Sequence, residues 1–246
     1  MKRLRIAAIV LLPVLLLAGC QALKNSESEA DPLIAGFKKT SPASVSDAMD
    51  QVLGQRGFLS HKIRPVVGGP IVGRAITALS RPAKPEDATP ALSTRHLTAM
   101  IDESKPGEVG VIVMEDGADV AAIGGLMSTA AKSRGMAGFV IDGGVRDVEQ
   151  IREMRLPVYA SSVIPATSVS RWASVTNGVP VKCGEVTVCP GDIIIADEDG
   201  IVAVPQARAA EVLKRALEID ERESKMVPLI KQYKSLSTVV RMFNRI

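Results

Sequence analysis

Arg146 and Asp147 stand side by side a few residues after a short apolar run, Phe139 to Ile141, which stops at Asp-Gly-Gly. Turn-forming residues bound the run, which is typical of a buried strand, and the residues that follow carry apolar side chains at helical spacing. The pair is therefore predicted to lie where a strand's carboxyl end meets the start of a helix, the edge at which α/β sheets bind ligands. A second interpretation stays open, in which Asp147 caps the helix and Arg146 lies in solvent.

The chemistry that this pair could perform is the stabilisation of negative charge. An arginine holds a carboxylate through two parallel hydrogen bonds, and a lone carboxylate suits Mg²⁺, which keeps several of its waters. Cleavage of a carbon–carbon bond next to a 2-oxo acid leaves charge on an enolate oxygen, where a cation and an arginine are most effective. The two histidines, His61 and His96, are far from the pair in sequence, so a histidine-built zinc site is not expected.

Two glycines, Gly124 and Gly125, open a second candidate element, an alanine-rich helix predicted to close near residue 135. Glycines at a helix start let the backbone amides of the next residues, Leu126 and Met127, approach an anion. One helix and one strand separate Leu126 from Arg146, a separation that can return the chain to the same sheet edge. The glycines could also serve only to begin the helix.

Secondary structure alternates along most of the chain. Helices are predicted at about 44–53 (capped by Ser44 or Ser46), 94–104 and 206–235. Strands are predicted at 108–115 and 156–162, in a pair within 64–80, and as a β-rich stretch over 179–205. At 246 residues with 46% hydrophobic content, the chain is long enough for a sizeable core in one large or two small domains. The alternation favours an α/β fold, a sheet flanked by helices.

The N-terminus has the pattern of an export signal. A basic start (Lys2, Arg3, Arg5) precedes an apolar run and small residues that end at Cys20, too short to span a bilayer as a stable anchor. Leu17 to Cys20 resembles the lipobox of bacterial lipoproteins, which implies a signal peptide over 1–19 and lipidation of Cys20. We therefore expect a lipid-anchored protein of the cell envelope, on the periplasmic or extracytoplasmic face. By the same resemblance, Gln21 favours an outer membrane where one exists.

Removal of residues 1–19 leaves no net charge. Three of the 30 Lys and Arg lie there and none of the 27 Asp and Glu do, so 27 face 27 in the mature chain. With two Tyr, one Trp and four Phe there is also little to stack on bases, and nucleic acid is not expected as a partner. Residues 20–40 are polar and turn-rich, and we predict that they tether the lipid to a domain.

Asp142 and the two cysteines Cys183 and Cys189 each allow two interpretations. Asp142 could orient Arg146 or cap a turn. Cys183 and Cys189 flank a short predicted hairpin and could form a disulfide in an oxidising compartment or remain thiols.

Taken in order, the stretches VSDAMDQVLGQRGFLSHKIRP, GGLMSTAAKSRGMAGFVIDGGVRDVEQIR, LPVYA and GEVTVCPGDIIIADEDGIVAVP resemble the RraA-like family. That family contains 4-hydroxy-4-methyl-2-oxoglutarate aldolases and regulators of ribonuclease activity A. The resemblance covers roughly residues 41–235. It implies a compact α/β domain of the swivelling β/β/α type at 41–205 with a C-terminal helical segment at 206–246, assembled as homotrimers or homohexamers.

The resemblance also implies roles for individual residues. Asp147 would hold a divalent cation, Mg²⁺ or Mn²⁺. Arg146 would hold the pyruvoyl group, and the Gly124–Met127 segment would bind the substrate carboxylate through its amides. An acid from the C-terminal segment of a neighbouring subunit would complete the site; Glu223 is favoured, with Glu221 and the nearby Asp220 as alternatives. Gly125 departs from the pattern, since the family's aldolases often carry an acidic residue there.

The expected function is that of a metal-dependent lyase acting through a pyruvate enolate. Its substrates would be 4-hydroxy-2-oxo acids, oxaloacetate, or both. The alternative is a non-catalytic RraA-like binding or regulatory lipoprotein.

Overall fold

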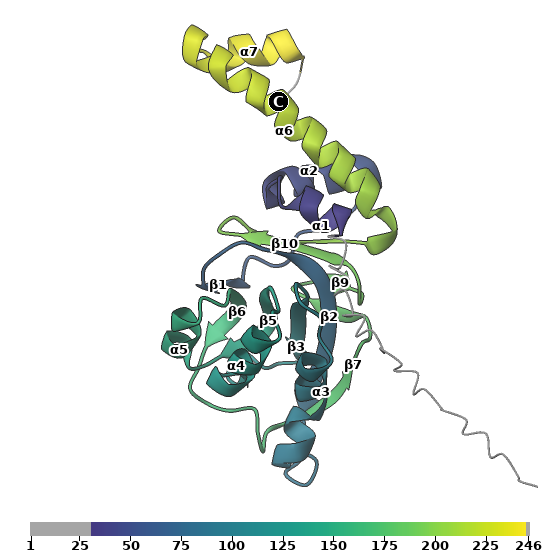
Figure 1. The fold of residues 1–246 in the computed structure, drawn as a ribbon, viewed down its shortest axis with the longest axis vertical. Coiled ribbons are helices and arrows are strands. Elements are labelled where there is room, and N and C mark those ends of the chain that lie inside the picture. The colour runs from purple at the N-terminus through teal and green to yellow at the C-terminus, as the bar shows by residue number, and fades with distance from the viewer. Residues whose placement is uncertain (1–30, 245–246) are drawn as a thin grey trace, which may run out of the picture. The chain divides into compact units, whose positions relative to one another are not determined.

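Nine strands form one strongly curved sheet in the computed structural model, which describes residues 31–244 (Figure 1). The main order is β1-β6-β5-β3-β2-β10-β11, with β4 paired to β5 and β7 paired to β2, and β8 and β9 form a separate hairpin. The strands are β1 (Arg64–Val67), β2 (Ile71–Pro82), β3 (Val109–Met114), β4 (Ala121–Ile123), β5 (Gly138–Val145), β6 (Val158–Val163), β7 (Trp172–Asn177), β8 (Val181–Cys183), β9 (Val186–Val188), β10 (Ile193–Asp197) and β11 (Gly200–Val204).

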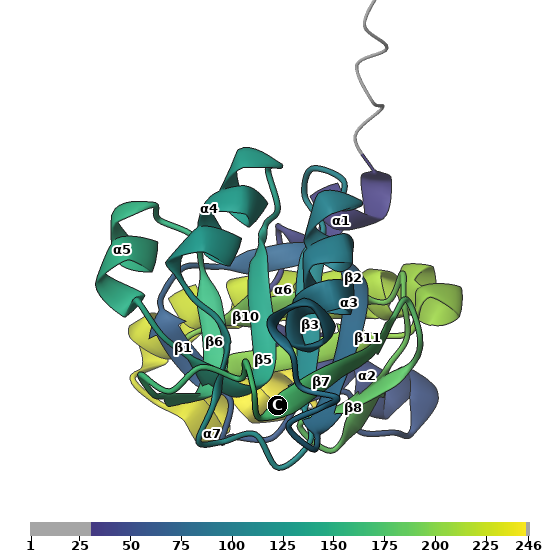
Figure 2. The same ribbon diagram turned by 90° about the horizontal axis from the view of Figure 1, so that it is seen from below.

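Four strands, β2, β3, β5 and β6, run parallel as neighbours. The helices α3 (Pro90–Asp102), α4 (Gly125–Ser133) and α5 (Val148–Glu153) connect them. Parallel neighbours have their carboxyl ends at one edge of the sheet, so the segments that follow β4 and β5 are brought together. Figure 2 shows α4 and α5 side by side.

The apolar residues divide among the faces of the curved sheet. Along β3, the side chains of Val109, Val111 and Val113 belong to the inner cluster, and those of Ile112 and Met114 belong to an outer one. This alternation follows from the two-residue period of a strand, and the whole strand is buried because both faces are covered. The inner cluster fills a nearly closed barrel.

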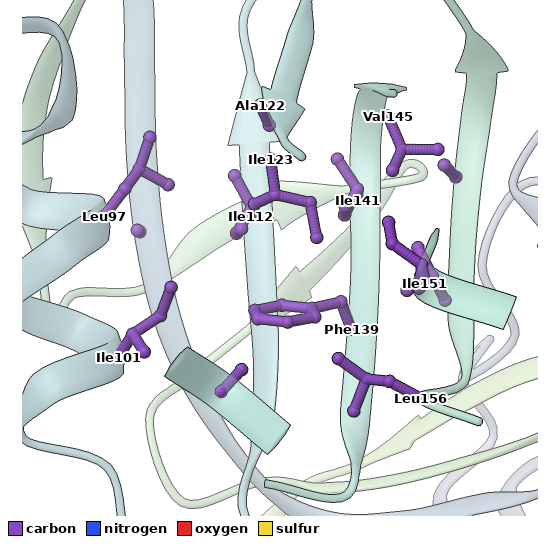
Figure 3. Packing of buried hydrophobic residues seen from close by; sticks show 14 of the residues in the cluster. Leu97, Ile101, Ile112, Ala122, Ile123, Phe139, Ile141, Val145, Ile151 and Leu156 are labelled. Atoms are coloured by element: carbon purple, nitrogen blue, oxygen red, sulfur yellow. The ribbon is translucent and has the colours of Figure 1, made fainter. Parts of the chain in front are cut away.

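Helices α3, α4 and α5 cover one outer face (Figure 3). Phe139 of β5 and Ile112 of β3 are fully buried there, between Leu97 on α3 and Ile151 on α5. Replacement of a buried phenylalanine by alanine typically lowers the free energy of unfolding by about 3–5 kcal/mol. This cluster fixes α4 and α5 against the strands that precede the Arg146-Asp147 pair.

The helices α1 (Pro32–Phe37), α2 (Pro42–Leu53) and α6 (Ala209–Tyr233) lie over another part of the sheet's outer surface, next to β10 (Figure 1). They pack on the outward-facing residues of β10 and β11. After a short 3₁₀ turn, η1 (Gln206–Arg208), α6 extends beyond this contact, and α7 (Leu236–Phe243) folds back on its outer end (Figure 1).

The predicted tether at 20–40 does not hold for its second half. Asp31 caps α1, and its carboxylate also accepts a 2.8 Å hydrogen bond from Arg74 on β2. Phe37 is fully buried among Val45 of α2 and Val212 of α6. Leu33 and Ile34 pack against the same cluster, so the folded domain begins at about residue 31 rather than 41.

The predicted fold class is confirmed, since the chain forms a mixed α/β domain with a nearly closed barrel-like sheet and a C-terminal helix. Two local predictions are wrong. Strands β1 and β2 do not pair with each other, because β1 is antiparallel to β6. Helix α2 begins at Pro42 with Ser41 as its cap, and neither Ser44 nor Ser46 caps it.

The cysteines Cys183 and Cys189 are both free thiols. In the β8-β9 hairpin, Cys183 is opposite Val186 next to the turn, whereas Cys189 follows the last residue of β9. Cys183 is buried, and that burial strongly raises the pKa of its thiol.

Within residues 31–244, no helix is long and apolar enough to cross a membrane. The predicted signal peptide at 1–19 and the lipidation site at Cys20 lie outside the described residues.

Candidate active site

Pairing of β4 with β5 brings the two sequence motifs together. Ile123 at the end of β4 is in register with Val145 at the end of β5, and the Arg146 N–H donates to the Ile123 carbonyl at 3.2 Å. The residues that follow these strands, Gly124 and Arg146, are therefore neighbours. The separation of one helix and one strand does return the chain to one edge of the sheet.

Asp147 has a backbone conformation that few non-glycine residues adopt, with φ of 57° and ψ of 37°. Its side chain makes no capping bond to its own helix, α5, although the residue stands at the N-cap position. The carboxylate instead accepts a 2.8 Å hydrogen bond from the backbone N–H of Gly125, the first residue of α4. Asp147 thus caps a neighbouring helix, and a left-handed residue is typical of the strained positions found at functional sites.

Both glycines make room for side chains from the β5-α5 segment. A Cβ at Gly124 would lie 2.6 Å from Oδ2 of Asp147 and 3.0 Å from Nε of Arg146. A Cβ at Gly125 would overlap the side-chain carboxamide of Gln150. The glycines therefore do more than begin a helix, because any side chain at either position would displace polar groups of the site.

The motifs line a cavity of about 300 Å³. The backbone N–H groups of Leu126 and Met127, in the first turn of α4, have no protein acceptor within the described part of the chain. Such free amides and the positive end of the helix dipole favour an anion. The lining residues are Thr94, Ala121, Ala122, Ile123, Gly124, Gly125, Leu126, Met127, Arg146, Asp147, Thr167, Ser168 and Val169.

Arg146 and Asp147 are only loosely paired. The distance from Nε to Oδ2 is 3.8 Å, and the two side chains are 42% and 47% exposed. An ion pair of this kind contributes at most about 1 kcal/mol, so both groups remain available to a ligand. Among residues 31–244, the Arg146 side chain has no other ion pair or hydrogen bond.

The donor set at this site suits one hard cation bound mostly by water and substrate. No cluster of three or more His, Cys, Asp or Glu side chains that could hold a metal occurs within the described residues. In the part of the chain that the structure describes, Asp147 is the one carboxylate on the cavity wall, and one of its oxygens is free of the bond to Gly125. Mg²⁺ and Mn²⁺ accept such a site, whereas a structural zinc site needs about four protein ligands.

Asp142 takes neither of its predicted roles. It lies inside β5, and its two oxygens accept hydrogen bonds from the Ser161 hydroxyl at 3.1 Å and from the Gly184 N–H at 2.8 Å. It lines a larger cavity of about 880 Å³ at the mouth of the barrel, where Arg81 is paired with Glu115. Asp142, Arg81 and Glu115 are thus already bound to protein partners, whereas both sequence motifs line the smaller cavity, which is therefore the better candidate site.

Glu223 does not reach the cavity within one protomer. It is exposed on the outer half of α6, and α6 packs over β10 and β11, away from α4 and α5 (Figure 1). Its predicted role therefore depends on a second subunit.

Sequence reasoning missed several cavity residues. Thr94 comes from α3, and Thr167, Ser168 and Val169 come from the segment after β6. These residues form no recognisable motif, and only the sheet pairing brings them together. Gln150, which touches Gly125, was also missed, although it follows Asp147 by three residues, a spacing that puts both on one helix face.

The chain is similar to known proteins along most of its length. The family model RraA-like, described as Aldolase/RraA, matches residues 42–203. A protein of Halalkalibacterium halodurans that carries the provisional name 4-hydroxy-4-methyl-2-oxoglutarate aldolase is 30% identical over 192 residues, which cover 78% of this chain and 84% of that protein.

Two solved structures are similar along most of the chain. An uncharacterised protein from Pseudomonas syringae pv. tomato has a TM-score of 0.77 at 28% identity, covering 86% of this chain and 93% of its own. RraAS2 of Streptomyces coelicolor, described as an unusual member of the RNase ES inhibitor RraA family, has a TM-score of 0.70 at 28% identity, covering 78% and 94%. The chain belongs to the RraA-like family.

Proposed function

We propose that this protein is a divalent-metal-dependent lyase that releases pyruvate from 2-oxo acids. The substrates would be 4-hydroxy-2-oxo acids of the 4-hydroxy-4-methyl-2-oxoglutarate type, oxaloacetate, or both. One observation carries the proposal: the cavity combines free helix-start amides, an available guanidinium and a single carboxylate. The names of relatives support the same class of reaction.

The chain's own groups match the charges of a bound 2-oxo acid. The N–H groups of Leu126 and Met127 donate to the substrate carboxylate, because helix-start amides favour anions. The Arg146 guanidinium faces the carbonyl oxygen at C2 and stabilises the negative charge that develops there when the carbon–carbon bond breaks. The α4 cap formed by Asp147 and Gly125 keeps the two motifs in register.

A divalent cation, Mg²⁺ or Mn²⁺, would be held by Asp147, with water and substrate oxygens as its other ligands. When bound, it would supply Lewis-acid stabilisation of the same oxygen that Arg146 faces. The free carboxylate oxygen of Asp147 supports this assignment, as does the lack of other acids on the cavity wall among residues 31–244.

The active assembly would be a homotrimer or homohexamer in which Glu223 of one subunit reaches the cavity of the next. The family resemblance suggests it, and the position of Glu223 on a projecting helix is compatible with it. Light scattering tests this proposal. A monomer that turns over substrate would contradict it.

The lipobox pattern supports lipidation at Cys20 and attachment to the extracytoplasmic face of the cell envelope. Substitution Cys20→Ser should leave the precursor uncleaved and without lipid. Maturation of the variant at the unchanged site, detected by mass spectrometry, would contradict this proposal.

The enzymatic proposal is tested by pyruvate release from a panel of 2-oxo acids by the mature domain, with Mn²⁺ and with chelator. We expect release from at least one substrate, abolished by the chelator. Binding of 2-oxo acids without any turnover would instead favour a binding or regulatory protein, and the cavity would then serve recognition alone.

A further inference from the structure

The space beside Gly125 belongs to the side chain of Gln150. A Cβ at Gly125 would overlap the Gln150 carboxamide oxygen and lie 2.6 Å from its Cδ. Gln150 follows Asp147 by three residues on α5, and long helical side chains point back toward the helix N-terminus. The carboxamide thus lies against the residue whose N–H donates to Asp147, and one position before the free amides of Leu126 and Met127.

The Gln150 carboxamide is uncommitted and neutral. It has no hydrogen-bond partner within residues 31–244, and the residue is exposed. A carboxamide donates and accepts hydrogen bonds, but it takes up no proton near neutral pH. The Gln150 side chain therefore touches the wall of the site but cannot act there as a general base.

The two candidate reactions differ in their need for a base. In oxaloacetate the C3–C4 bond breaks, CO₂ leaves, and the electron pair passes to the C2 carbonyl to give the enolate, which is then protonated at C3. In a 4-hydroxy-2-oxo acid the same bond breaks toward C2, but C4 becomes a carbonyl only if its hydroxyl proton is transferred to an acceptor. Positioned proton transfer of this kind typically contributes about 10²–10⁴-fold to a rate.

We propose that Gln150 is a specificity-determining residue that makes this site a better decarboxylase than aldolase. The inference rests on the proposed function. Asp147 is the one carboxylate on the cavity wall within the described chain, and neither histidine lines the cavity. The Gln150 carboxamide occupies the space into which a side chain at position 125 would project. Decarboxylation needs no base and proceeds there, whereas aldol cleavage lacks a positioned acceptor for the hydroxyl proton of its substrate.

The test compares kcat/KM for pyruvate release from oxaloacetate and from 4-hydroxy-4-methyl-2-oxoglutarate, in the wild-type protein and in Gln150→Glu. The rate with metal alone is subtracted. Both substrates are dianions, so a general electrostatic effect of the new carboxylate largely cancels in the ratio. We expect wild type to favour oxaloacetate, and Gln150→Glu to raise the ratio of aldol cleavage to decarboxylation by roughly tenfold or more. The gain should diminish as the new carboxyl is protonated at low pH.

Two further variants separate this role from a structural one. Gln150→Ala removes the carboxamide without adding a base, so it should not raise the ratio. Arg152→Gln makes the same change in net charge on the same helix, but residues two apart do not share a helix face, and its ratio should equal that of wild type.

The outcomes are distinct. A wild-type protein that cleaves the aldol substrate faster, or a ratio in folded Gln150→Glu within about twofold of wild type, would overturn the inference and leave the proposed function intact. If Gln150→Glu does not fold, a raised ratio in Gln150→Ala would overturn it equally. Absence of pyruvate release from either substrate would overturn the proposed function and this inference with it.

Discussion

Substitutions of Asp147 should separate its capping role from its role toward a metal. The carboxylate accepts a 2.8 Å hydrogen bond from the Gly125 N–H, and the residue has a left-handed backbone. Asparagine keeps an acceptor and tolerates this conformation, so Asp147→Asn should lose less than about 0.5 kcal/mol of unfolding free energy. Asp147→Ala loses the cap, about 1 kcal/mol, and meets a left-handed penalty of about 1 kcal/mol more.

For a domain of this size, 1 kcal/mol shifts Tm by roughly 2–4 °C, so Asp147→Ala should melt roughly 4–8 °C below wild type and Asp147→Asn close to it. Both variants should nevertheless lose Mn²⁺ binding and pyruvate release, because both remove the carboxylate charge. The assays are thermal unfolding, calorimetric Mn²⁺ titration and kcat/KM. Wild-type Mn²⁺ affinity in Asp147→Asn would refute the metal assignment, and equal melting temperatures for the two variants would refute the capping argument.

Three further changes probe the site and the N-terminal anchor. Arg146→Lys should bind Mn²⁺ normally yet lose roughly 3 kcal/mol of transition-state stabilisation, since an ammonium lacks the bidentate fork; an unchanged kcat/KM would contradict this. Gly124→Ala should displace Arg146 and Asp147 and reduce kcat/KM by about 10²-fold, whereas Gly68→Ala, where a Cβ meets nothing within 4 Å, should match wild type. Partial burial alone would raise the pKa of Asp31, but hydrogen bonds from Arg74 and the Leu33 N–H lower it. The ionised Asp31 carboxylate therefore stabilises the fold at neutral pH, and this stabilisation is lost as the pH falls through the lowered pKa. At pH 7 the unfolding free energy of Asp31→Asn should therefore be lower than that of wild type by less than about 1 kcal/mol. In acid the two proteins should have the same unfolding free energy, and denaturant titrations at both pH values can show this.

Local patterns in the sequence predicted the elements that hold the site. The apolar run at 139–141 marks β5, and Gly124-Gly125 mark the start of α4. The sequence also predicted that Arg146 and Gly124 meet at one sheet edge, because one helix and one strand are enough to bring the chain back.

Contacts between distant segments could not be predicted in this way. The pairing of β1 with β6, rather than β2, depends on the whole sheet. The burial of Phe37 depends on α6, more than 170 residues later, and the short apolar stretch at residues 32–37 does not by itself indicate that contact. The bond from Gly125 to Asp147 and the contact of Gln150 with Gly125 likewise arise only when α4 and α5 are packed side by side.

The central claim is that the cavity formed by Arg146, Asp147 and the start of α4 performs metal-dependent lyase chemistry. It is tested most directly by the initial rate of pyruvate formation from oxaloacetate at a fixed Mn²⁺ concentration, measured for wild type, Asp147→Asn and Mn²⁺ alone. The account predicts that wild type exceeds the metal-only rate by roughly 10²-fold or more, and that Asp147→Asn falls to that rate. A wild-type rate equal to that of Mn²⁺ alone would contradict it. So would a rate in Asp147→Asn that equals the wild-type rate and exceeds that of Mn²⁺ alone.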